Sequence, residues 1–414
     1  MNGPVPADLP VAQARLAIAA ALCAPHEPER VELRGALGRV LAGDVIAPLD
    51  VPAHDNAGMD GYALRGDDLA ESDDTVLRVV GRGLAGHAYT GAVPPGAAVR
   101  IMTGAVLPSG CDTVAPIERC ELDGERVHIA AGLRRGDNAR ARGEDLRAGG
   151  VALPAGRWLR PADIGLLASL GFSDVTVERR LRVALLSSGD ELRPIGQPLD
   201  AGAGYDSNRY TLTAMLQRLG CEVLDLGLVA DDPARIEAVL RRGCEAADVV
   251  ITSGGVSSGD ADYLRRAMAA LGDVAFWRIA MRPGRPMAFG RIASGGRDAL
   301  LFGLPGNPVA VMVTFYAFVR DALLQLMGAR ATPLPLWPVV ALEALRKKPG
   351  RTEYQRARLQ RLADGRWGAR ITGSQGSAIL HSMSEADGLL VLPDELGTVA
   401  AGATVDFLPF EGLI

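Results

Sequence analysis

A run of glycine, serine and aspartate residues follows a short, strongly apolar stretch near the middle of the chain. Residues 248–252 are apolar or β-branched after the first position, which is typical of a parallel strand covered on both faces. The next segment, T-S-G-G-V-S-S-G-D-A-D at 252–262, contains three glycines whose backbone N–H groups can approach an anion closely. A helix beginning near Asp260 would add its positive end. The run therefore predicts a phosphate-binding loop.

Two aspartates at the end of this loop indicate what else it binds. The spacing of Gly254 and Gly259 matches a Walker A loop, but Asp260 and Ala261 stand where that motif has Lys and Ser or Thr. We therefore do not expect an ordinary P-loop NTPase. Carboxylates repel a phosphate unless a divalent cation lies between them, so Asp260 and Asp262 indicate a metal-bridged phosphate. Helix capping is an alternative interpretation of both, and an equally good one for Asp260.

The loop must be positioned by a domain in which strands and helices alternate. Between residues 181 and 330 the pattern predicts strands at 181–188, 221–229 and 248–252, a helix over 207–219 preceded by Asp206, and a helix to Cys244 opened by Asp232 and Pro233. Three further strands lead to an apolar helix over 309–327. Alternation throughout indicates a doubly wound α/β domain.

Three polar turns follow strands of this predicted sheet. They are S-S-G-D-E-L at 187–192, the glycine loop at 252–260, and L-P-G-N-P at 304–308. Ligands of such sheets bind beyond the carboxyl ends of the strands, so we expect the three turns to converge. Convergence would bring Glu191 and Asp262 beside the phosphate as ligands of Mg²⁺.

Other polar residues near these turns have two interpretations. Arg282 and Arg285, in M-R-P-G-R-P, could clamp an oxyanion with several N–H donors, although arginines in turns are usually only exposed. Asn307 and Pro308 suit a ligand-binding turn, but they equally suit a helix cap and a first-turn proline.

The flanking regions are of other types. Residues 8–22 predict an Ala-rich helix capped by Asp8, and residues 161–170 a second helix. Residues 75–151 predict an all-β module, with alternation too weak to separate a barrel from a sandwich. After a proline-rich linker, the tail to residue 414 predicts a small β domain with several basic residues. Asp60 and Asp145 lie in glycine-flanked turns, where aspartates are usually structural.

Composition excludes several classes of protein. The 414 residues suggest two to four domains, and the net charge of −5 gives no reason to expect a nucleic-acid or anionic membrane partner. Five scattered cysteines and five histidines without metal-ligand spacing argue against structural zinc and a disulfide framework. No basic signal or apolar span opens the chain, so we expect a cytoplasmic protein. Only Lys347 and Lys348 could supply a lysine-dependent mechanism.

Together the motifs resemble the molybdopterin molybdenumtransferase family. They are N-A-G-M-D-G-Y-A, R-I-M-T-G-A, G-E-D, S-S-G-D-E-L, D-S-N-R, the glycine loop, R-P-G-R-P, G-L-P-G-N-P and G-S-Q-G-S, and they span the chain in order. The resemblance implies a homodimer and four domains. These are a discontinuous domain I at 1–52 and 147–180, an inserted β module as domain II at 53–146, an α/β molybdopterin-binding domain III at 181–330, and a C-terminal β-barrel as domain IV at 331–414.

The resemblance also implies roles for particular residues. The expected catalytic residues are Asp60, Asp145, Glu191, Asp231 and Asp262, of which Glu191 and Asp262 would hold Mg²⁺. Substrate would contact Thr103, Ser253, Gly254, Gly255, Ser257, Gly259, Arg282, Arg285, Gly306, Asn307 and Pro308. Molybdate would contact Arg278, Arg282, Arg351 and Ser374; relatives often have lysine at positions 278 and 282.

The activity implied is insertion of molybdate into adenylylated molybdopterin, with Mg²⁺-dependent phosphoanhydride hydrolysis, release of AMP and replacement of the metal already on the dithiolene. Possible protein partners are the adenylyltransferase and recipient molybdoenzymes. Two alternatives remain. A molybdopterin adenylyltransferase shares the α/β domain but normally needs only that domain. A scaffold that binds partner proteins, as the related domain of gephyrin does, would not need the acidic residues Glu191 and Asp262.

Overall fold

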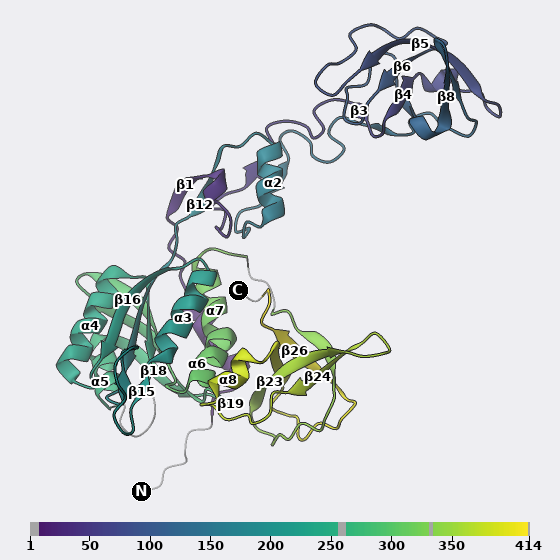
Figure 1. Cartoon of the computed structure of the whole chain (residues 1–414). Helices are drawn as coiled ribbons and strands as arrows, with labels where there is room; N and C mark the ends of the chain where they lie inside the picture. Colours follow the sequence, from purple (N-terminus) through teal and green to yellow (C-terminus); the bar gives the residue numbers. More distant parts are fainter. Residues whose placement is uncertain (1–7, 256–261, 331–333, 413–414) are drawn as a thin grey trace.

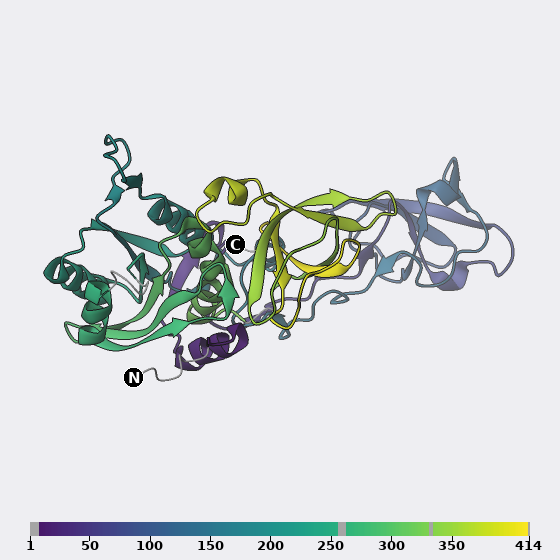
Figure 2. The same ribbon diagram turned by 90° about the horizontal axis from the view of Figure 1, so that it is seen from below.

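The computed structural model describes residues 8–255, 262–330 and 334–412, without the side chain of Asp262. An α/β unit and a β-barrel lie side by side at one end of the molecule (Figure 1). A small unit that contains helix α2 connects them to a β module at the opposite end, and the view in Figure 2 shows the same elongated arrangement.

The α/β unit contains a six-stranded sheet. Its strands, in spatial order, are β16 (Glu222–Val229), β13 (Arg182–Ser188), β17 (Val249–Ser253), β21 (Arg297–Leu304), β20 (Pro286–Ser294) and β18 (Gly272–Arg278). The first four are parallel, whereas β20 runs antiparallel to both of its neighbours, β21 and β18. The expected alternation of strand and helix holds as far as β18 but is wrong between β18 and β21, because no helix separates β18, β20 and β21 in the chain. Gly295 and Gly296, both with positive φ, form a two-residue hairpin turn between β20 and β21, and a hairpin needs no intervening helix.

Helices cover both faces of this sheet. One face packs against α1 (Val11–Ala21), α3 (Ser207–Arg218), and the continuous run of α6 (Pro308–Thr314), the π-helical turn η4 (Phe315–Val319) and α7 (Arg320–Leu326). The other face packs against α4 (Pro233–Ala246) and α5 (Asp262–Leu271). Within β13, Val183 and Leu185 face the first group, and Ala184 and Leu186 face the second. This confirms the doubly wound α/β domain.

The run Pro308–Leu326 is long and apolar enough to cross a membrane, but 78% of it is buried inside the protein. Its side chains belong to the core of the α/β unit. The hydropathy of this run is therefore that of a core helix.

Two of the three predicted helix caps are confirmed. Asp206 accepts a hydrogen bond from the backbone N–H of Arg209 at 3.2 Å, and Asp232 accepts one from Arg235 at 2.8 Å. The third is wrong, because α1 begins at Val11 with Pro10 at the cap position. The Asp8 carboxylate instead accepts two hydrogen bonds from Arg285, which follows β18 in the chain.

The inserted β module has one six-stranded sheet. In spatial order its strands are β7 (Thr113–Pro116), β4 (Gly61–Leu64), β6 (Ala97–Ile101), β5 (Thr75–Gly83), β9 (Arg126–Ile129) and β8 (Cys120–Asp123); the short elements η2 (Gly66–Asp68), η3 (Ile117–Arg119), β3 (Asn56–Ala57) and β10 (Ala139–Arg140) complete it. The sequence suggested only a turn where β4 lies. Because β4 pairs with a strand on each side and is wholly buried, tertiary contacts override the turn propensity of the N-A-G-M-D-G sequence that leads into it.

Segments on both sides of the module form the connecting unit. Here β1 (Pro28–Glu32) pairs with β12 (Asp174–Glu178), β2 (Val45–Ile46) pairs with β11 (Val151–Leu153), and η1 (Leu33–Gly35) and α2 (Pro161–Ser169) pack nearby. Leu41 from before the module shares one core with Leu159 and Val177 from after it. The β module is thus an insertion, while the exact domain boundaries remain predictions.

The C-terminal region is a closed barrel of five strands, as expected. They are β22 (Trp337–Ala341), β23 (Thr352–Arg361), β24 (Trp367–Ile371), β25 (Gly388–Leu392) and β26 (Thr404–Pro409), and helix α8 (Leu380–Ser384) lies between β24 and β25 in the chain. The ring closes because β23 pairs with both β24 and β25. Strand β19 (Met281–Arg282), from the α/β unit, adds to the start of β23. This pairing places the barrel beside the R-P-G-R-P turn.

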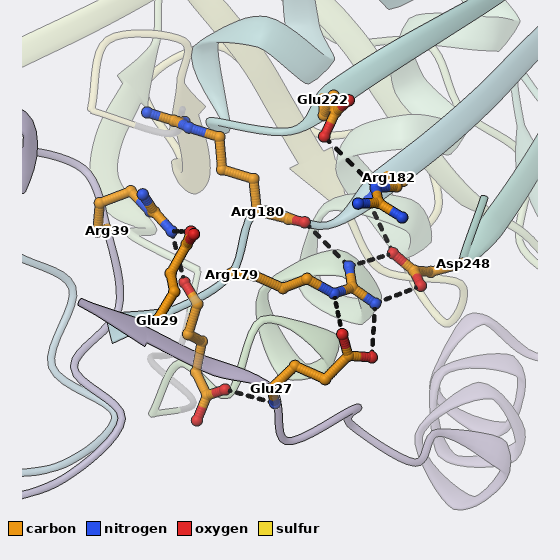
Figure 3. Close-up of polar contacts among 9 residues, drawn as sticks. Glu27, Glu29, Arg39, Arg179, Arg180, Arg182, Glu222 and Asp248 are labelled. Carbon is orange, nitrogen blue, oxygen red and sulfur yellow. Dashed lines mark hydrogen bonds and ion pairs between the residues drawn. The ribbon is translucent and has the colours of Figure 1, made fainter. Parts of the chain in front are cut away.

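Arg179 joins the connecting unit to the α/β unit (Figure 3). Its guanidinium donates two hydrogen bonds to Glu27, at 2.7 and 3.0 Å, and two to Asp248, at 2.7 and 2.8 Å. Asp248 immediately precedes β17 and also accepts the backbone N–H of Arg182. Burial by itself would raise the pKa of Asp248, but hydrogen bonds from Arg179 and Arg182 hold it below its ordinary value.

Candidate functional site

The three predicted turns converge on one cavity of about 1380 Å³. Its lining includes residues 188–192 at the end of β13, residues 253–255 at the end of β17 and residues 305–307 after β21. The chain passes from β13 through α3 to β16 on one side, and from β16 through α4 to β17 on the other side of β13. The cavity thus lies where the strand order reverses, which is where doubly wound sheets bind ligands.

Glycines allow the turns to approach one another. A Cβ atom at Gly254 would lie 2.6 Å from the carbonyl oxygen of Ser188, and one at Gly255 would lie 2.5 Å from the Leu264 side chain. Both glycines have positive φ, of 92° and 67°. A larger residue at either position would meet both a steric clash and backbone strain. The predicted phosphate loop therefore begins with glycines that the packing requires. Ser257 and Gly259, the other predicted phosphate contacts in this loop, lie outside the described residues.

Asn208, at the start of α3, ties two of the turns together. Its Nδ2 atom donates hydrogen bonds to Ser253 Oγ at 2.9 Å and to the Gly306 carbonyl at 2.6 Å. Next to it, the buried Asp206 carboxylate accepts a hydrogen bond from Ser187 Oγ at 3.0 Å. Asn208 was not among the predicted site residues, although it lies in the D-S-N-R motif.

Ser188 contributes a buried polar atom to the cavity wall. Its residue is 4% exposed, and its Oγ has no hydrogen-bond partner among the described residues. A buried hydroxyl is normally paired in a folded protein. Since Ser188 lines the cavity beside Gly254 and Gly255, this hydroxyl is suited to a ligand that accepts or donates a hydrogen bond.

Carboxylates line the same cavity. Glu191 lies there with Asp190 and Asp231, and the backbone N–H of Asp231 donates to Asp190 Oδ1 at 3.1 Å. Glu191 folds back so closely over Gly189 that a Cβ at Gly189 would lie 2.7 Å from its carboxylate. Within the described part of the chain, the Glu191 carboxylate makes no hydrogen bond or ion pair, whereas its backbone carbonyl accepts the N–H of Gly204 at 2.9 Å. Asp262 is the first residue of α5, but its side chain is outside the description.

These residues fit Mg²⁺ bound with a substrate phosphate. Among the described residues, no three His, Cys, Asp or Glu side chains are grouped to hold a metal by themselves. Mg²⁺ is commonly bound by one or two carboxylates, substrate phosphates and water. The unpaired Glu191 carboxylate and the adjacent glycine turns supply such an incomplete ligand set.

Three arginines that line the cavity, Arg282, Arg285 and Arg351, form what we call the arginine wall. Arg285 donates two hydrogen bonds of 2.9 Å to Asp8, which has ion-pair distances of 3.3 Å to Arg278 and 3.8 Å to Arg351. The pKa of Asp8 is lowered, chiefly by the hydrogen bonds from Arg285. These are the contacts that replace its predicted role as a helix cap.

Arg282 also borders a second cavity. This cavity, of about 710 Å³, is lined by Arg346, Lys347, Lys348 and Arg351 as well. Arg282 Nη1 lies 3.9 Å from the buried carboxylate of Glu353. Lys347 Nζ is directed to backbone carbonyls, including that of Leu396 at 2.7 Å, so one of the two lysines has a structural partner.

The barrel contributes the G-S-Q-G-S turn to the main cavity through Gln375, Gly376 and Ser377. The fully buried Arg356 holds this turn by donating to the carbonyls of Ser374 at 2.9 Å and Gly376 at 3.1 Å. Ser374 itself lines a separate cavity of about 360 Å³. The structure therefore does not bring its side chain to the other predicted molybdate contacts.

The turn after β21 distinguishes between ligand binding and helix capping, the two interpretations of Asn307 and Pro308. Asn307 occupies the cap position of α6, but its side chain makes no capping hydrogen bond and lines the cavity together with Gly306. Helix capping therefore does not account for the Asn307 side chain. Pro308 is the first residue of α6 and does not line the cavity, so the first-turn interpretation suffices for it.

Three predicted residues are distant from this cavity within one chain. Asp60 and Thr103 lie in the β module, where Asp60 Oδ1 accepts two 2.7 Å hydrogen bonds, from the Thr103 backbone and hydroxyl, which lower its pKa. Asp145 lies between β10 and β11, where the chain leaves the β module, and its backbone N–H donates to the carbonyl of Val51. None of the three lines the cavity, and the module is at the far end of the molecule (Figure 1).

Comparison with known protein families gives three consecutive matches. Residues 9–171 match "MoeA N-terminal region (domain I and II)", residues 184–325 match "Probable molybdopterin binding domain", and residues 338–410 match "MoeA C-terminal region (domain IV)".

Whole-chain relatives agree with these matches. A molybdopterin molybdenumtransferase of Haemophilus influenzae is 40% identical over 404 residues, which cover 97% of this chain and 98% of the relative. One from a Nostoc species is 37% identical over 373 residues, covering 89% and 85%. The crystal structure of a molybdopterin biosynthesis MoeA protein from Pyrococcus horikoshii has a TM-score of 0.83 at 26% identity, covering 97% of this chain and all of the other. The chain therefore belongs to the molybdopterin molybdenumtransferase family.

Proposed function

We propose that this chain inserts molybdate into adenylylated molybdopterin, with Mg²⁺-dependent hydrolysis of the phosphoanhydride and release of AMP. The observation that carries the proposal is the meeting of a glycine cradle, an unpaired carboxylate and an arginine wall on one cavity of about 1380 Å³. The glycine cradle and the carboxylate, through a bound Mg²⁺, suit a phosphoanhydride, and the arginines suit a tetrahedral oxyanion. Family membership supports the same reaction class.

In this proposal the phosphates lie on the glycine turns. The backbone N–H of Gly255 and the hydroxyls of Ser188 and Ser253 bind phosphate oxygens. Gly254, whose own N–H donates to the carbonyl of Leu304, lets the phosphate approach closely, and Ser257 and Gly259 continue the loop. Glu191 and Asp262 would hold Mg²⁺, which neutralises the pyrophosphate and stabilises the leaving phosphate when bound. Asn208 keeps the turns in register, so that the phosphates are oriented for attack by water.

Molybdate would occupy the arginine wall. Arg282, Arg285 and Arg351 line the cavity, and Arg278 adjoins them through its contact with Asp8. A planar guanidinium can bind two oxygens of one oxyanion, which an ammonium group cannot do in the same geometry. The arginines at 278 and 282 therefore suit molybdate binding even though relatives often have lysine there.

A homodimer would explain the remote residues. The β module extends far from its own cavity, so in a dimer it can reach the cavity of the other subunit (Figure 2). Asp60, Thr103 and Asp145 would then act as polar groups around the bound substrate. We further propose that the protein is cytoplasmic and that it receives substrate from the adenylyltransferase and passes product to molybdoenzymes.

The test follows two products at once. Purified protein is incubated with adenylylated molybdopterin, Mg²⁺ and low molybdate, and AMP release and protein-bound molybdenum are measured together. We expect molybdate-dependent AMP release that is lost in Glu191→Gln. Tight binding of the adenylylated pterin with neither AMP release nor metal transfer would overturn the proposal and favour a binding or scaffolding role.

A further inference from the structure

Asp8 lies in the extended segment before α1, and main-chain hydrogen bonds hold it there. The N–H of Leu9 donates to the carbonyl of Arg278 at 2.7 Å, and the N–H of Ala280 donates to the carbonyl of Leu9 at 2.8 Å. These two bonds form a parallel bridge between Leu9 and Ile279. On the other side of Leu9, Val11 begins α1, which packs into the core of the α/β unit. The backbone next to Asp8 is therefore fixed.

The Asp8 carboxylate contacts three arginines, two from the segment that runs from the end of β18 to the start of β20 and one from the barrel. Arg285 pairs with it through two parallel hydrogen bonds of 2.9 Å, while Arg278 and Arg351 lie at 3.3 and 3.8 Å. The Asp8 side chain is only 15% exposed. Arg285 and Arg351 line the main cavity, whereas Asp8 does not. Asp8 thus lies behind the arginine wall and does not occupy the cavity.

This arrangement has two physical effects on the wall. Three guanidinium charges and one carboxylate charge leave a net charge of +2 on the group. The bidentate pair also uses two of the five N–H donors of Arg285 and fixes the plane of its guanidinium, so three donors remain in a set orientation. Asp8 therefore weakens the electrostatic attraction of the arginines for any anion. It also fixes the direction of the Arg285 N–H donors, which favours an anion whose oxygens match them.

We propose that Asp8 is a positioning and specificity-determining residue of the oxyanion site, which acts through Arg285. By weakening the electrostatic attraction and fixing Arg285, it makes the site select molybdate by size and shape over smaller divalent oxyanions such as sulfate. The identity of the preferred oxyanion rests on the proposed function. The role of Asp8 rests on its contacts with the arginines.

The test is equilibrium binding of molybdate and of sulfate to the full chain at constant ionic strength, without pterin. We expect Asp8→Asn to bind sulfate at least about fivefold more tightly, because a nearby negative charge is removed. We expect the ratio of sulfate Kd to molybdate Kd to fall by a similar factor, because Arg285 is no longer held in one orientation. Asp8→Glu keeps the charge but not the geometry, so it should lower the ratio without the gain in sulfate affinity.

Two comparisons separate positioning from general effects. In an Arg285→Lys background, Asp8→Asn should no longer change the ratio, since coupled residues give non-additive effects. Asp298→Asn removes a carboxylate paired with Arg291 on the β20–β21 hairpin and should leave both Kd values unchanged. Thermal unfolding of each variant checks that it is folded, and Asp8→Glu carries the test if Asp8→Asn is not.

Several results would overturn the inference. The first is a wild-type protein that binds molybdate no more tightly than sulfate. The second is a ratio of sulfate Kd to molybdate Kd that is the same in wild type, Asp8→Asn and Asp8→Glu. The third is a change of this ratio by Asp8→Asn that is equally large with Arg285 and with Lys at position 285. Failure of the proposed function would look different. In that case the wild-type protein would bind molybdate selectively and the Asp8 variants would lose that selectivity, but no AMP would be released from adenylylated molybdopterin.

Discussion

The side chain of Asn208 donates a 2.6 Å hydrogen bond to the carbonyl of Gly306, which links the start of α3 to the turn after β21. The same Nδ2 atom donates to Ser253 Oγ, at the end of β17. A single amide group thus holds two of the three turns that line the cavity. These turns come from separate strands, so their relative position depends on such contacts.

Asn208→Ala should therefore impair substrate binding more than folding. Loss of the hydrogen bond to Ser253 leaves a buried hydroxyl without its donor, at a cost of about 1–3 kcal/mol, and loss of the bond to Gly306 releases an exposed turn. We expect a higher Kd for adenylylated molybdopterin, measured by titration calorimetry. Thr211→Ala, which removes a local hydrogen bond to Ser207 on the same helix, is the control and should bind normally. Equal affinity of the two variants would contradict the role of Asn208.

Glu191→Gln should abolish the Mg²⁺ dependence of AMP release without loss of stability. The carboxylate lines the cavity and makes no bond to the described residues, so its charge has no structural partner there. We expect AMP release to fall about 100-fold or more, as is common when one charge-stabilising group is removed. Glu237→Gln, an exposed member of a helical ion pair on α4, should leave the rate unchanged. A Glu191→Gln protein with a normal Mg²⁺ titration would exclude Glu191 as a metal ligand.

Arg356→Lys should loosen the G-S-Q-G-S turn. Burial, and then the nearby charge of Arg282, lower the pKa of this arginine, and among the described residues no carboxylate lies within ion-pair distance of it. Its donors hold Ser374, Gly376 and Ser382, at 2.6 to 3.1 Å. Lysine cannot reproduce the planar arrangement, so the KM for molybdate should rise while kcat changes less. Arg358→Lys, on the exposed side of the same strand, should leave KM unaltered. An unchanged KM in Arg356→Lys would mean that the turn does not depend on Arg356.

Asp248→Asn should lower the free energy of unfolding at neutral pH, because it removes the ion pair by which Arg179 joins the connecting unit to the α/β unit. The folded-state pKa of Asp248 is below its ordinary value of 3.8, so its contribution is present above that value and is lost as pH falls through the folded pKa. We expect a loss of about 2–4 kcal/mol at pH 7, because one partner of a largely buried pair is removed. The difference from wild type should shrink in acid.

Urea denaturation of both proteins at pH 7 and at several acidic pH values measures this. Asp364→Asn breaks an exposed pair with Arg366 and should cost little at any pH. A destabilisation by Asp248→Asn that stays constant into acid would show that the Asp248 charge is not its source.

Much of the fold was predictable because short-range signals act locally. Asp206 and Asp232 begin helices through hydrogen bonds to residues three positions later, and those bonds need no distant partner. The apolar run before Gly254 indicated a buried strand for a similar reason. Because parallel strands end at one edge of a sheet, the meeting of the three polar turns followed from the order of the elements.

The remaining features depended on contacts between residues far apart in the chain. Asp8 resembled a helix cap by its position, but its carboxylate binds Arg285, 277 residues away. The sequence around β4 has the pattern of a turn, but its residues form a strand because β6 and β7 pair with its two edges. Asn208 gained its role only when the ends of β17 and β21 were brought beside α3. Local propensity thus determined which elements form, whereas packing decided which polar groups meet. The reason is that a polar group removed from water must hydrogen-bond to another group, and packing determines which groups lie close enough.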